Sequence, residues 1–124
     1  MKKTMIRGIT KAFMFALIIS IISIAYIQTA NAHPPKDISI SYDLAQQTLS
    51  VTITHKTTFT SRHHIKTVII TRNGTAVSTE EYKDQPDESP FTYTYSLPAV
   101  AGDVIKVEVT CNVFGSKEAT LTVE

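Results

Sequence analysis

Tryptophan is absent from this 124-residue sequence, and cysteine occurs once, at Cys111. A chain with one cysteine cannot form an internal disulfide, so a small domain held together by disulfides is excluded. Cys111 is therefore a buried apolar filler, a site of intermolecular pairing, or a reactive or metal-ligating thiol. The three methionines all lie within the first 14 positions, so the sequence after residue 32 also lacks a thioether.

The first 32 residues have the composition of an export signal. A basic leader precedes a nearly unbroken apolar run, Ala12–Ile27, and Ala30-Asn31-Ala32 supplies the small-x-small pattern that signal peptidases accept. We expect a signal peptide over residues 1–32, cleaved after Ala32, and an exported protein located in the periplasm, the cell envelope or the medium. Because the run is a little shorter than the roughly 20 residues of a comfortable membrane span, an uncleaved anchor is the alternative.

The charge of the remaining sequence excludes two classes of partner. Four of the twelve Lys and Arg residues lie in the leader, so eight are left beside eleven Asp and Glu, a formal charge of −3. Nucleic acids and anionic membranes both require clustered positive charge. We therefore expect no nucleic-acid partner, and contact with a membrane only through an uncleaved leader.

After the leader, the sequence has no helical periodicity and consists of short Val-, Ile-, Thr- and Tyr-rich runs separated by turn residues. This pattern predicts an all-β domain over residues 33–124. Seven runs of this length are typical of an immunoglobulin-like β-sandwich. Asn73-Gly74 predicts a two-residue hairpin turn, and the polar segment 83–90 is expected to be a solvated loop. The predicted strands are 37–43, 48–56, 65–72, 75–83, 91–97, 104–111 and 117–123.

Two of these runs alternate regularly enough to assign their faces, because successive side chains point to opposite sides of a strand. His55 is in phase with Leu49, Val51 and Ile53, and Cys111 is in phase with Ile105, Val107 and Val109. Both residues are thus predicted to end a core-facing row. In the pair that opens the third run, we expect His63 to point inward and His64, beside Lys66, to lie on the surface.

An alternating strand direction brings four of these side chains to one end of the domain. If each strand runs opposite to the preceding one, odd-numbered strands begin and even-numbered strands end at the same pole. His33 precedes the first strand, His55 ends the second, His63 begins the third, and Cys111 ends the sixth. The sequence therefore predicts a site of three imidazoles and one thiol.

Imidazole and thiolate together indicate a transition metal. Iron, copper, zinc and nickel accept imidazole, and a set of three His and one Cys would close a structural zinc tetrahedron. A blue-copper site is disfavoured, because no His follows Cys111 and the domain has no axial Met. If cleavage makes His33 the first residue, its amino group and imidazole could together chelate copper.

The same residues resemble the motifs of a known family. "HPP" at His33, "HKTTFTSRHHI" from His55 and "CNVFG" at Cys111 are similar to the catalytic domain of the superoxide reductases, or desulfoferrodoxins. The resemblance implies a seven-stranded immunoglobulin-like sandwich and one non-haem iron, held by four equatorial His and an axial Cys. It further implies reduction of superoxide to peroxide with electrons from a small redox donor protein.

Carried over by position, His33, His55 and His63 match the first three His ligands, and Cys111 matches the axial ligand. Phe114 occupies the position of the family's fourth His, and the Lys that precedes the first His in the family is missing. Two alternatives stay open beside iron redox chemistry. In one, zinc or copper occupies the same residues; in the other, the domain keeps the fold without a metal and acts as a binding module.

Overall fold

The alternating apolar pattern of the sequence folds into seven β-strands in the computed structural model, which describes residues 34–124. The predicted signal peptide and His33 lie outside the described residues. Each strand is within two residues of its predicted position, and β2 and β4 end two residues earlier than expected. The strands are β1 Asp37–Asp43, β2 Thr48–Thr54, β3 Ile65–Arg72, β4 Thr75–Glu81, β5 Phe91–Ser96, β6 Val104–Cys111 and β7 Ser116–Thr122.

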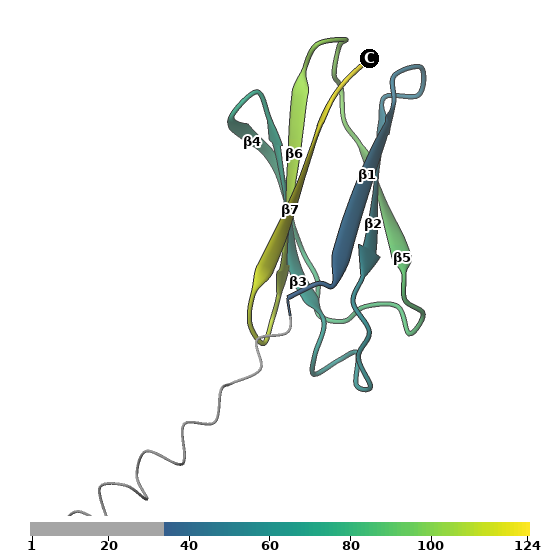
Figure 1. The fold of residues 1–124 in the computed structure, drawn as a ribbon, viewed down its shortest axis with the longest axis vertical. Coiled ribbons are helices and arrows are strands. Elements are labelled where there is room, and N and C mark those ends of the chain that lie inside the picture. The colour runs from purple at the N-terminus through teal and green to yellow at the C-terminus, as the bar shows by residue number, and fades with distance from the viewer. Residues whose placement is uncertain (1–33) are drawn as a thin grey trace, which may run out of the picture. The chain divides into compact units, whose positions relative to one another are not determined.

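The strands form two antiparallel sheets that face each other, which confirms the predicted β-sandwich (Figure 1). One sheet has the order β1-β2-β5, and the other has the order β4-β3-β6-β7. Every paired neighbour is antiparallel. β4 therefore belongs with β3, whereas in the constant-type immunoglobulin domain the fourth strand lies beside the fifth. Within residues 34–124 no helix is long and apolar enough to cross a membrane.

The two rows that the alternation predicted lie at the centre of the core, which buried side chains of β1, β3 and β5 complete. Leu49, Val51 and Ile53 of β2 are fully buried, and so are Ile105, Val107 and Val109 of β6. Burial of such side chains supplies the main stabilising free energy of a small domain. His55 and Cys111 continue these rows with only 3% of each residue exposed, as predicted. The apolar core thus ends, at one pole, in an imidazole and a thiol.

A tight hairpin after β3 and an anchored residue after β4 direct the chain back to this pole. Asn73 and Gly74 have φ values of 50° and 82°, so the predicted tight hairpin between β3 and β4 is confirmed. At the other end of β4, the Tyr82 ring stacks on Tyr93 of β5, with ring centroids 4.3 Å apart, and its N–H donates to the carbonyl of Lys66. Tyr82 therefore fastens the start of the loop 82–90, which returns across the pole to β5.

Candidate metal centre

His55 is the first residue after β2 and remains buried where the strand ends. Its backbone N–H donates to the Ser89 hydroxyl at 3.0 Å, and its Nδ1 lies 2.7 Å from Oε1 of Gln85. The other ring nitrogen, Nε2, is buried and has no hydrogen-bond partner among residues 34–124. Burial of a polar atom without a hydrogen-bond partner costs folding free energy. This nitrogen is therefore a candidate to bind a ligand from outside the described residues.

Gln85 was not identified from the sequence, because the segment 83–90 was expected to be a solvated loop. That expectation is wrong for Gln85, which is 6% exposed and directed into the pole. Its Oε1 accepts the N–H of Ile65 at 3.0 Å, and its Nε2 donates to the carbonyl of His55 at 2.6 Å. The side chain thus joins the end of β2 to the start of β3. Nothing in the local composition marks it, since its partners lie 20 and 30 positions away in the sequence.

His63 and Cys111 are in contact although they lie 48 positions apart in the sequence. Nε2 of His63 lies 3.1 Å from Sγ of Cys111, and the backbone N–H of Val113 donates to the same sulfur at 3.4 Å. The His63 ring packs edge-on against that of His55, with centroids 4.8 Å apart and an interplanar angle of 89°. His63 therefore points inward, as predicted.

His64 is a correction to the sequence analysis, which placed it on the surface. It is 8% exposed, and its Nδ1 is buried without a partner among the described residues. Strand phase failed here because β3 begins only at Ile65, and its pairing with β6 shifts register between Ile65 and Thr67. A register shift of this kind turns neighbouring side chains away from strict alternation. His64 is not a member of the group that could hold a metal.

Asn112 holds the backbone on both sides of His63. Its Nδ2 donates to the carbonyl of Arg62 at 2.9 Å, and its Oδ1 accepts the N–H of His64 at 2.8 Å. The Asn112 N–H also donates to the His64 carbonyl at 3.0 Å. Since Asn112 follows Cys111 directly, these contacts fix the loop that carries His63 against the end of β6.

His33 lies outside the described residues, but the next residue, Pro34, is held at this pole. Gly115 has a φ of 91°, and a Cβ on it would lie 2.9 Å from the Cβ of Pro34. Only glycine permits both this backbone conformation and this close approach. Phe114, at the position where the resemblance calls for a fourth His, is 64% exposed.

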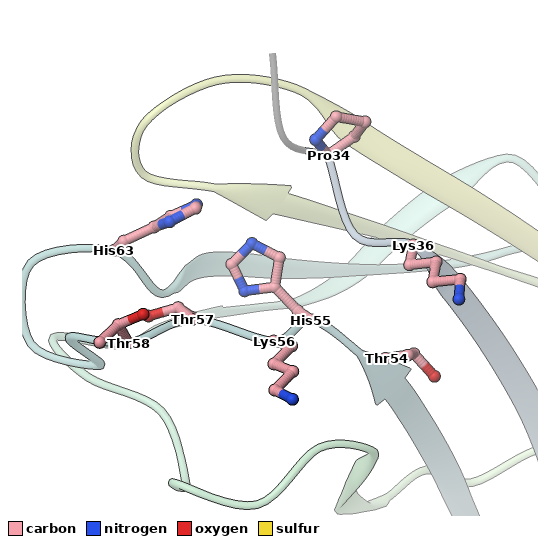
Figure 2. A pocket seen from close by; sticks show the side chains of 8 residues that line it. All are labelled: Pro34, Lys36, Thr54, His55, Lys56, Thr57, Thr58 and His63. Atoms are coloured by element: carbon pink, nitrogen blue, oxygen red, sulfur yellow. The ribbon is translucent and has the colours of Figure 1, made fainter. Parts of the chain in front are cut away.

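A pocket of about 380 Å³ opens onto the two imidazoles (Figure 2). Figure 2 shows the His55 ring at its centre, with His63 on one side and Pro34 and Lys36 on the other. Lys36 and Lys56 belong to its lining, which contains no carboxylate. These two lysines are therefore the only side chains in the lining that carry a permanent charge.

His55, His63 and Cys111 fit a transition metal. One donor atom from each lies within 4.8 Å of the others, and zinc bonds to imidazole at roughly 2.0 Å and to thiolate at roughly 2.3 Å, so a small movement would bring all three into contact with one ion. The available donor on His55 is Nε2, since Nδ1 is engaged by Gln85. The fold and this group together define a β-sandwich with a His/His/Cys site suited to a metal ion.

No protein-family model matches the sequence, and no curated protein matches it. Among solved structures, the chain is similar to a superoxide reductase (neelaredoxin) from Ignicoccus hospitalis. The two share 19% sequence identity over 80% of this chain and 85% of that one, with a TM-score of 0.45.

Proposed function

We propose that the domain binds one transition-metal ion through Nε2 of His55, Nε2 of His63 and Sγ of Cys111, and that His33 supplies a fourth donor. Two observations carry the proposal: donor atoms of His55, His63 and Cys111 lie within 4.8 Å of one another, and Nε2 of His55 is buried without a hydrogen-bond partner in residues 34–124. His33 is included because the adjoining Pro34 lines the pocket beside His55 and His63.

Within this proposal, the metal is non-haem iron and the protein is an exported, superoxide-reductase-like redox protein. Two imidazoles and a thiolate suit iron, and the pocket leaves one side of the site accessible to a small molecule. When bound, iron would supply the one electron that, with two protons, converts superoxide to hydrogen peroxide, and a small redox donor protein would return that electron. Lys36 and Lys56 would draw the anionic substrate to the pocket.

Metal analysis of the protein, prepared anaerobically, tests the proposal most directly. We expect near-stoichiometric metal, and with iron a sulfur-to-iron charge-transfer band in the oxidised protein that disappears in Cys111→Ser. The matched variants are His63→Gln and His64→Gln, because these neighbours differ in membership of the donor group. His63→Gln should lose the metal and His64→Gln should keep it.

The same measurements separate the alternatives. A structural zinc site would give a colourless protein that loses much of its stability on chelation, because the binding free energy of such a site is also folding free energy. Copper bound by an amino-terminal His33 would require the cleaved chain. A protein that contains no transition metal and takes up none when it is offered would overturn the proposal and leave a metal-free binding module.

A further inference from the structure

Gln85 is the only side chain of the described residues that contacts His55 through a hydrogen bond to its ring. This contact bears on how the proposed site works, because a histidine offers a metal either of two nitrogens and the hydrogen bond at one nitrogen selects the other. The outcome depends on whether the atom that faces Nδ1 of His55 is an oxygen or a nitrogen of the Gln85 amide.

Two backbone contacts fix the orientation of this amide. One terminal atom of Gln85 lies 3.0 Å from the N–H of Ile65, a group that only donates. The other lies 2.6 Å from the carbonyl of His55, a group that only accepts. The first must therefore be oxygen and the second nitrogen. The reverse orientation would place two donors together at Ile65 and two acceptors together at His55.

The oriented amide determines the tautomer of His55. Because Oε1 of Gln85 only accepts, Nδ1 of His55 at 2.7 Å must carry the proton. In the neutral ring the lone pair then lies on Nε2, the buried nitrogen that lacks a partner within residues 34–124. A proton on Nε2 would instead leave a donor buried among the described residues without an acceptor, which is unfavourable.

We propose that Gln85 is a positioning residue that holds His55 as the Nδ1–H tautomer and presents its Nε2 to a metal ion. The use of the tautomer for metal binding rests on the proposed function, whereas the tautomer itself does not. Gln85 contacts the backbone on both sides of the β2–β3 loop, so it also fixes where the ring stands relative to β3. It acts through His55 and does not touch the reacting species.

Nitrogen-15 NMR of the metal-free protein tests the first half of the proposal. We expect a protonated Nδ1 and an unprotonated Nε2 at His55, with the signals assigned by their loss in His55→Gln. In Gln85→Leu, which removes the acceptor, the Nδ1–H preference should disappear. A His55 that keeps the Nδ1–H tautomer in Gln85→Leu, or that is the Nε2–H tautomer in the unmutated protein, would overturn the proposal.

Titration with Co²⁺ or Zn²⁺ tests the second half. Removal of such a supporting contact usually lowers metal affinity by about 10- to 100-fold, and we expect this loss in Gln85→Leu. Gln47→Leu is the matched control, because Gln47 joins backbone groups in the same way at the opposite pole and contacts no histidine. Its Oε1 accepts the N–H of Ala99, and its Nε2 donates to the carbonyls of Ala99 and Leu44. Equal losses of affinity in both variants would reduce Gln85 to a structural role and overturn the proposal.

Gln85→Glu keeps the test decisive if Gln85→Leu does not fold. A carboxylate retains the acceptor for Nδ1 of His55 and for Ile65 but cannot donate to the His55 carbonyl. The Nδ1–H tautomer and the Co²⁺ affinity should both persist in this variant, and loss of the tautomer would overturn the proposal. An unmutated protein that binds no Co²⁺ would instead overturn the proposed function, while the NMR result on metal-free protein still decides the role of Gln85.

Discussion

The thiol sulfur of Cys111 lies 3.1 Å from Nε2 of His63, although 48 positions separate the two residues in the sequence. The contact depends on the loop that carries His63 being held against the end of β6. Asn112 does this with both ends of its carboxamide, through the carbonyl of Arg62 and the N–H of His64. The residue after the cysteine thereby sets the position of the histidine.

We expect Asn112→Ala to lower metal affinity by about 10- to 100-fold, because the backbone on both sides of His63 loses its anchor. The loss in unfolding free energy should be modest, about 1 kcal/mol, since Asn112 is exposed and water can replace its contacts. Asn112→Asp keeps the acceptor for the N–H of His64. Its metal affinity should therefore lie between those of the unmutated protein and Asn112→Ala. Chemical denaturation and a Zn²⁺ titration measure both quantities. Unchanged affinity in Asn112→Ala would show that His63 needs no such support.

Gly115→Ala should be more destabilising than Gly102→Ala, although the two glycines have nearly equal φ values of 91° and 90°. Both variants place a side chain in a left-handed conformation, at a cost of about 1–2 kcal/mol. A Cβ on Gly102 meets nothing within 4 Å, whereas on Gly115 it approaches Pro34. The difference between their unfolding free energies therefore measures the contact with Pro34. Equal values would mean that Pro34 moves aside freely.

Lys56→Glu should slow the proposed reaction with superoxide by roughly tenfold at low ionic strength, because it reverses a charge in the lining of the pocket. The difference should shrink as salt is added, since salt screens exposed charges. Pulse radiolysis at several salt concentrations measures the rate. Lys106→Glu makes the same charge change on β6, five positions before Cys111, and should affect the rate much less. Equal effects of the two variants would exclude local attraction by Lys56.

The tyrosines on β5 and at the end of β4 predict a loss of stability at alkaline pH. Burial raises the pKa of Tyr93 to about 12, helped by the nearby Tyr82 and Asp84, and burial also raises the pKa of Tyr82. An unfolded tyrosine ionises near 10, so the stabilisation is complete below that pH and is lost as the pH rises towards 12. Denaturation between pH 9 and 12 should show this loss, reduced in Tyr93→Phe. A stability that does not change over this range would contradict the raised pKa values of Tyr82 and Tyr93.

Much of the fold could be predicted from the sequence because β2 and β6 are each buried on one face only. Their strict alternation placed His55 and Cys111 at the ends of core-facing rows. The antiparallel order of the strands then brought His63 to the same pole. These inferences use only local pattern and chain direction, and both properties survive into the folded domain.

The remaining features of the site depend on tertiary contacts that leave no local pattern. His64 is buried because the chain does not enter β3 before Ile65, and a register shift follows at once. Gln85 lies in a segment rich in acidic residues and proline, and its buried side chain is bound by the His55 carbonyl and the Ile65 N–H, which lie far away in the sequence. Sequence periodicity reveals a buried side chain only when that residue is in phase with a repeating apolar pattern.

The donor group combines His55, which directly follows β2 of the sheet β1-β2-β5, with Cys111, which ends β6 of the sheet β4-β3-β6-β7. An ion bound there would cross-link the two sheets at the end where the apolar core stops. This site can form only after both sheets have packed together, because its ligands lie far apart in the sequence. The exported protein that we propose would then acquire its metal in the compartment where it folds, and the metal supply of that compartment would help to decide which ion it carries.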